Sequence, residues 1–163
     1  MNALPSHSTI PSWYQVPLEI KQLLLAAVEN WENTTCSEQF ILQALNHPET
    51  TLEVLVSAYR YFFYKHNNYM SRRLAMQVMD RVAQEESLPD DWEELQIVLR
   101  NRQCDTPIRL YLSAYTALGM MLARWGAFQA AIEIARRIQA IDTNNEFGAG
   151  VILKILTDEN DEI

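Results

Sequence analysis

Three histidines are the side chains whose usual chemistry would be metal binding or proton transfer near neutral pH. His7 lies in an N-terminal stretch with prolines and serines, whereas His47 and His66 fall in expected turns between helices. Either kind of site needs the rings to converge, so this spacing favours turn polarity. The chain also lacks GxSxG, HExxH and GxxxxGK[ST] motifs, and its four glycines form no phosphate-binding loop. We therefore expect no catalysis, no bound metal and no cofactor.

Acidic side chains gather in three adjacent pairs, Glu85-Glu86, Asp90-Asp91 and Glu93-Glu94. Such a run could bind a divalent cation or a basic partner, but its spacing does not match an EF-hand loop. A solvated loop whose carboxylates cap a following helix is the simpler interpretation. That helix would carry Trp92 and Leu95 as its first apolar residues.

Residues 59–69, YRYFFYKHNNY, hold more aromatic side chains than one buried face of a helix can cover. In one interpretation some of them pack inward and the others contact Trp92. In the other they form a recognition surface, because aromatic residues and arginine are enriched at binding hot spots. The arginines at Arg60, Arg72-Arg73, Arg124 and Arg136-Arg137 could clamp an acidic peptide or a carboxylate, or pair within the molecule.

The composition is that of a single helical domain. The chain has 163 residues, of which 48% are apolar and 21% charged, with only four glycines and six prolines. A net charge of −8 disfavours binding to nucleic acid or to an anionic membrane. There is no signal-peptide pattern and no apolar run near the roughly 18 residues of a membrane span. Cys36 and Cys104 are expected to be free thiols, and the protein is expected to be cytoplasmic.

Capping signals and apolar periodicity divide the chain into about eight helices of an all-α fold. Residues 1–15 are expected to form a flexible arm, and residues 158–163 an acidic tail. Between them, residues 16–157 are predicted to form one domain, with a short inserted helix within 85–105.

Residues 112–145 show the clearest pattern, two amphipathic helices joined by a tight turn at Trp125-Gly126. The pattern resembles a tetratricopeptide repeat (TPR), which spaces large and small residues at fixed offsets over about 34 residues. The matching residues are Tyr115, Leu118, Gly119, Leu122, Gly126, Phe128, Ala131, Ala135 and Ile138. The resemblance implies antiparallel helix pairs stacked as a short right-handed superhelix, closed by a solvating end helix at residues 146–157.

In the TPR family the first helix of each pair lines a concave groove that grips protein partners. The resemblance therefore implies that partner contacts come from Leu55, Tyr59, Phe62, Met120 and Arg124.

A second, more degenerate unit is expected between Thr51 and Gln84. The stretch KHNNYMS, residues 65–71, is expected to be a turn about four residues longer than usual. With that allowance, the residues predicted to repeat the TPR positions are Val54, Ser57, Ala58, Tyr61, Ala75, Met79 and Val82. In the preceding helix, Thr35 with Glu38 is interpreted as a capping box, with Ser37 as a competing cap.

Residues 55–69 and 108–126 are also similar to small bacterial TPR-like proteins encoded among nitrogen-fixation genes. That similarity would imply a helper in nitrogenase or metalloenzyme biogenesis. We predict a non-catalytic interaction module, an adaptor or assembly factor whose partner is another protein or peptide. The alternatives are a helical bundle that encloses a small apolar ligand, and a homodimer closed by the apolar surface of the end units.

Overall fold

The computed structural model describes residues 16–161, and this part of the chain contains helices and no strands. Its eight helices are α1 Leu18–Glu29, α2 Thr34–Leu45, α3 Leu52–Tyr64, α4 Asn68–Glu85, α5 Trp92–Asn101, α6 Thr106–Arg124, α7 Phe128–Ile141 and α8 Ala149–Asp161. The all-α prediction is confirmed. The predicted arm at residues 1–15 lies outside the described residues. Helix α8 continues to Asp161, so the acidic segment predicted as a tail is helical over its first residues.

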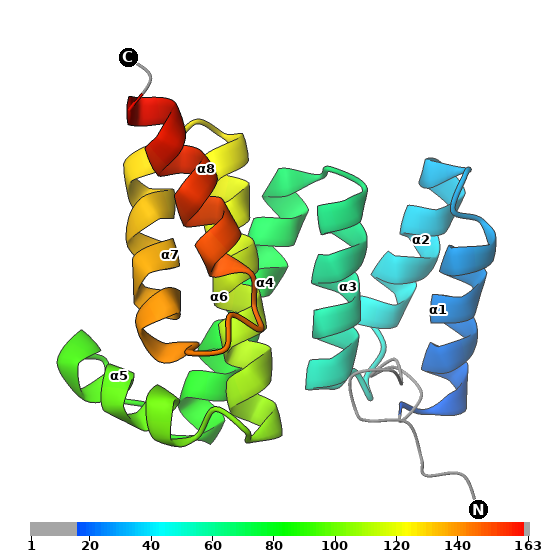
Figure 1. Ribbon diagram of the computed structural model, residues 1–163. Coiled ribbons are helices and arrows are strands. Elements are labelled where there is room, and N and C mark those ends of the chain that lie inside the picture. The colour runs from blue at the N-terminus through cyan, green and yellow to red at the C-terminus, as the bar shows by residue number, and fades with distance from the viewer. Residues whose placement is uncertain (1–15, 162–163) are drawn as a thin grey trace, which may run out of the picture.

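Three antiparallel hairpins form the body of the molecule: α1 with α2, α3 with α4, and α6 with α7. The first helix of each hairpin runs in the same direction, so the three turns lie together at the top of Figure 1. We call this the turn end of the molecule. Helix α4 packs against α6 and joins the second and third hairpins, while α8 covers α7.

The turns of the second and third hairpins have the same backbone geometry. In each, three successive N–H groups donate to carbonyls of the preceding helical turn, at 2.9–3.2 Å. The central residue has a positive φ, 59° at His66 and 82° at Gly126. Helix α4 begins directly after Asn67, whose side chain accepts a hydrogen bond from the N–H of Met70 at 3.1 Å. The prediction of a long turn at residues 65–71 is therefore wrong, because Asn67 caps a helix that starts at Asn68.

Because the two turns are equal, each residue of the second hairpin corresponds to the residue 60 positions later in the third hairpin. Ser71, Ala75 and Val78 of α4 thus occupy the positions of Ala131, Ala135 and Ile138 of α7, and all six are buried. The predicted match through Ala75, Met79 and Val82 was shifted by four residues, since it counted the start of α4 as turn. In α3 the predicted match is shifted by one residue. The residues that correspond to Tyr115, Leu118, Gly119 and Leu122 are Leu55, Ala58, Tyr59 and Phe62.

Two buried serines tie the second helix of a hairpin to the first. The hydroxyl of Ser71 donates to the carbonyl of Tyr59 at 3.0 Å, and that of Ser37 donates to the carbonyl of Ala27 at 2.8 Å. Helix α2 is capped instead by Asn33, whose side chain accepts from the N–H of Cys36. The predicted capping box at Thr35 is therefore wrong, and Ser37 packs inside the hairpin.

The inserted helix α5 leaves the hairpin stack and lies against α7 (Figure 1). Of the two predicted cap candidates, Asp90 and Asp91, it is Asp91 that caps the helix, with its carboxylate 3.3 Å from the N–H of Glu94. Arg137 of α7 lies with its Cζ 4.6 Å from the centroid of the Trp92 ring, and Arg100 donates to the carbonyl of Ala140 at 3.2 Å. The insertion therefore covers the side of α7 and leaves the space between α3 and α6 open.

Candidate functional site

A cleft of about 230 Å³ runs between α3 and α6, the neighbouring first helices of two hairpins. Its lining residues are Tyr59, Arg60, Phe63, Tyr64, Ser113, Thr116, Ala117, Met120, Glu146 and Phe147. We call this the α3–α6 cleft. A larger hollow of about 550 Å³ is lined by residues of α7 alone, so it has no second wall.

The cleft is hollow because its two walls carry side chains of different size. Helix α3 contributes aromatic rings, whereas α6 contributes Ser113, Thr116 and Ala117 at helical spacing before Met120. The Thr116 hydroxyl donates to the carbonyl of Leu112 at 2.8 Å, so this polar group is satisfied within α6. A small-residue floor between an aromatic wall and a methionine provides an adaptable apolar surface.

Arg124 stands at the turn end of the cleft and links its two walls. Its Nη1 donates to the carbonyl of Phe63 at 3.2 Å, and its Cζ lies 4.1 Å from the centroid of the Phe63 ring. The guanidinium is exposed, and no described carboxylate pairs with it. The positive charge at this end is thus held in place by a ring and a carbonyl.

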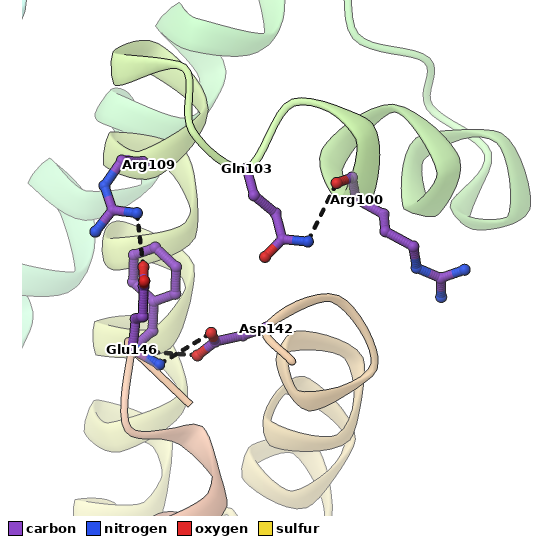
Figure 2. Close-up of polar contacts among 6 residues, drawn as sticks. Arg100, Gln103, Arg109, Asp142 and Glu146 are labelled. Carbon is purple, nitrogen blue, oxygen red and sulfur yellow. Dashed lines mark hydrogen bonds and ion pairs between the residues drawn. The ribbon is translucent and has the colours of Figure 1, made fainter. Parts of the chain in front are cut away.

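The opposite end of the cleft is formed by the loop between α7 and α8, which Figure 2 shows in close-up. The carboxylate of Asp142 accepts hydrogen bonds from the N–H groups of Glu146 and Phe147, at 2.9 and 2.8 Å. Glu146 in turn pairs with Arg109 of α6 at 2.7 Å, and the Arg109 Cζ lies 5.2 Å from the centroid of the Phe147 ring. Buried Asp142 therefore fixes the loop that presents Glu146 and Phe147 to the cleft.

The ionisation state of Tyr59 follows from its place in the cleft. Burial raises the pKa of the Tyr59 hydroxyl above its usual value, although the neighbouring Arg60 opposes this rise. Tyr59 is therefore neutral at physiological pH. Among residues 16–161 no group of three His, Cys, Asp or Glu side chains is arranged to hold a metal ion. Within the same part of the chain, no helix has the length and apolar character needed to cross a membrane.

The five predicted contact residues are only partly brought together. Tyr59 and Met120 line the cleft, and Arg124 closes its turn end. Phe62 is 1% exposed and belongs to the core, and Leu55 is half-buried against that core. Phe62 is therefore corrected from a groove residue to a core residue, because its side chain is packed in the hydrophobic core and does not line the cleft.

Sequence reasoning missed the floor of the cleft and its far end. The spacing of Ser113, Thr116 and Ala117 before Met120 places them on one face of α6, and that signal could have been used. Glu146 and Phe147 come from a loop far along the chain, and no pattern in the sequence points to them.

The chain is 27% identical over 156 residues to an uncharacterized 19.8 kDa protein in the nifW 5′ region of Azotobacter chroococcum mcd 1. The alignment covers 93% of this chain and 86% of that protein. No protein-family model matches the chain, and no solved structure matches it. The similarity agrees with the predicted link to nitrogen-fixation genes, while membership of the TPR family stays a prediction.

Proposed function

We propose that this protein is a non-catalytic protein-binding module, an adaptor or assembly factor that holds a partner segment in the α3–α6 cleft. The observation that carries the proposal is the cleft itself, with an aromatic wall, a methionine, a small-residue floor and a fixed arginine at one end. Aromatic residues, methionine and arginine are the residues that binding interfaces favour. Tyr59, Met120 and Arg124 keep the predicted role, and Phe63 replaces Phe62.

A protein segment suits this cleft better than an enclosed small molecule. Its volume of about 230 Å³ is below the range of about 300–1,000 Å³ typical of ligand pockets. Tyr64 and Met120 are exposed at its rim, so a bound group would also contact the surface outside it. An extended or helical segment can cover such a surface, whereas a small apolar ligand would remain largely in water.

We place the partner of the protein among the proteins that serve nitrogen fixation. The support is the relative in the nifW 5′ region, which aligns with nearly the whole of this chain. A helper in the biogenesis of a metalloenzyme would need a partner-binding surface and no metal site of its own. The proposed module offers such a surface in the α3–α6 cleft, and its site of action would be the cytoplasm.

Site-specific photo-crosslinking in a nitrogen-fixing bacterium tests the proposal. A photoreactive benzoylphenylalanine replaces Met120 at the rim of the cleft, and in a matched control it replaces Ile97 on α5, which is also exposed. We expect one protein to be crosslinked from position 120, and more strongly in cells that fix nitrogen than in cells grown on ammonium. Mass spectrometry identifies that protein.

A Ser113→Trp variant provides the second control, because the indole would fill the floor of the cleft. It should suppress the crosslink from position 120 while the thermal unfolding midpoint stays close to that of the parent. Equal crosslinking from positions 97 and 120, or a crosslink insensitive to Ser113→Trp, would remove the cleft as the binding site.

A homodimer is the second candidate, favoured by one specific observation. Leu18, Leu25 and Val28 are exposed along the outer side of α1, in the terminal hairpin of the stack. Their spacing of seven and three residues places them on one helix face. Light scattering distinguishes this candidate: a dimer would keep twice the monomer mass on dilution, and Leu25→Glu would halve that mass.

A further inference from the structure

Positive and negative charges are segregated along this acidic chain. Residues 54–79 and 106–132 contain six arginines or lysines and no aspartate or glutamate. The remaining residues carry seven arginines or lysines and all 21 acidic residues of a chain whose net charge is −8. These two ranges include the turn regions of the second and third hairpins (Figure 1), and four of their six positive residues, Lys65, Arg72, Arg73 and Arg124, lie at or next to those two turns.

Six exposed residues lie in or next to the turns of the second and third hairpins, and we call this set the turn-end patch. They are Tyr64, Tyr69, Arg72, Arg73, Arg124 and Trp125. Tyr64 is 66% exposed, Tyr69 68% and Trp125 44%. Exposed aromatic rings beside arginine are the composition of interface hot spots rather than of a solvated surface.

Two of the three arginines of the patch, Arg72 and Arg124, lie against aromatic rings and not against carboxylates. The Cζ of Arg72, in the first turns of α4, lies 5.3 Å from the centroid of the Trp125 ring. Arg124 is fixed over Phe63 and to its carbonyl, as described above. No described carboxylate lies within 4.0 Å of Arg72, Arg73 or Arg124, whereas Arg81, Arg102, Arg109 and Arg137 each have such a partner.

A guanidinium stacked on a ring keeps its edge N–H groups available, and those groups match a carboxylate in charge and geometry. The stacking also holds the side chain in place, so less rotamer freedom is lost when a carboxylate binds. The two hairpins thus present two ordered positive groups, Arg72 against the Trp125 ring and Arg124 against Phe63.

We propose that the turn-end patch binds an acidic segment of a partner protein, with carboxylates on Arg72, Arg73 and Arg124 and apolar side chains on Tyr64, Tyr69 and Trp125. This inference rests on the proposed function as a protein-binding module, and it adds the chemistry of the partner. The chain's own net charge of −8 opposes a nucleic acid, whose charge density is far higher than that of an acidic peptide.

Fluorescence anisotropy with defined probes tests the proposal on the full chain. The probe is a fluorescein-labelled peptide of 16 residues in which glutamate and aspartate alternate with leucine and phenylalanine. Its analogue has glutamine and asparagine at the acidic positions, and a single-stranded oligonucleotide of equal charge serves as a second polyanion. We expect the acidic peptide to bind, the amide analogue to bind at least roughly tenfold more weakly, and binding to weaken with added salt.

Two double variants, which change the net charge by the same amount, distinguish binding at the patch from a general electrostatic effect. Arg72→Glu with Arg124→Glu should weaken binding of the acidic peptide at least roughly tenfold. Arg136→Glu with Lys154→Glu changes two exposed residues outside the patch, neither paired with a described carboxylate, and should alter binding less than about twofold. If charge reversal disturbs folding, as unfolding midpoints would show, Arg72→Gln with Arg124→Gln replaces it with the same expectation.

Four outcomes would overturn the proposal: absence of peptide binding, equal loss in both double variants, equal binding of the amide analogue, or preference for the oligonucleotide. The protein could also prove to be a dimer that dissociates in the double variant Arg72→Glu with Arg124→Glu. The patch would then bind a second copy of this chain, and the proposal of a partner protein would be rejected. The cleft is tested separately, because Ser113→Trp should abolish the crosslink from position 120 and leave acidic-peptide binding unchanged. Failure of one experiment therefore leaves the other proposal standing.

Discussion

The second and third hairpins share one turn geometry but differ where their two helices approach most closely. In the third hairpin that position is Gly119, where a Cβ atom would lie 3.1 Å from Cγ2 of Ile134. In the second it is Tyr59, whose carbonyl accepts the Ser71 hydroxyl. Close packing at Gly119 stabilises the third hairpin, whereas a buried hydrogen bond helps to stabilise the second. Tyr59 is only 3% exposed, so its ring packs in the core and contributes its remaining edge to the cleft.

Core packing should give the largest effect that separates the two hairpins. Phe62 is almost fully buried, whereas Leu122 at the equivalent position is half-buried. Phe62→Ala should lower the free energy of unfolding by about 3–5 kcal/mol, since it removes a large buried side chain and leaves a cavity. Urea denaturation measures the loss. Leu122→Ala should lower the free energy of unfolding clearly less. A smaller loss for Phe62→Ala than for Leu122→Ala would contradict the assignment of Phe62 to the core.

The close approach of the third hairpin makes it sensitive to added volume. Ala131 is fully buried where α7 meets α6, near Gly119. Ala131→Leu should destabilise the protein by about 1–3 kcal/mol through overpacking, measured by thermal unfolding. The matched change Ala130→Leu lies on the exposed side of α7 and should be close to neutral. An unchanged midpoint for Ala131→Leu would contradict the tight contact.

Much of the fold was predictable from sequence because periodicity and caps act locally. Asp91 caps α5 and Leu95 lies inside, as the pattern predicts. The errors arise where local chemistry permits two structures. Asn67 and Asn68, for example, suit a turn as well as a helix start.

The site was less predictable than the fold. In the aromatic run, neighbouring residues of the helix are turned by about 100° from one another, so a shift of one residue in register exchanges Phe62 for Phe63. The far end of the cleft depends on Asp142, which brings Phe147 to α6 only through the tertiary fold. Amphipathic patterns identify which faces are buried, but they do not say which loop will close a cleft.

The third hairpin also contains a tyrosine that makes stability depend on alkaline pH. Burial raises the pKa of Tyr111 to about 12, with the neighbouring Tyr115 and Asp80 adding to the rise. The folded state therefore retains the proton between about pH 10 and pH 12, where the unfolded chain loses it. Stability is unaffected below pH 10 and should fall by about 1–2 kcal/mol as pH rises through this window.

Tyr111→Phe provides the control for that pH dependence, since it removes the ionising group and keeps the ring. Urea unfolding at pH 9 and pH 11.5 should show a smaller loss for the variant than for the parent. An equal loss in both proteins would mean that other groups cause the alkaline destabilisation. The equivalent position before α3 is Thr51, which does not ionise, so this pH effect belongs to the third hairpin.

The smallest expected effect concerns the turns of the two hairpins, where His66 and Gly126 occupy equivalent positions. A positive φ costs a residue with a side chain about 1 kcal/mol relative to glycine. His66→Gly should therefore stabilise the protein by up to about 1 kcal/mol, reduced by the greater freedom of glycine in the unfolded chain. Gly126→His should destabilise it by a similar amount, because a Cβ at Gly126 meets no atom within 4 Å and only the backbone opposes it. Opposite signs in thermal unfolding would establish that the two turns are equivalent, whereas a destabilising His66→Gly would show that the imidazole contributes an interaction that glycine cannot replace.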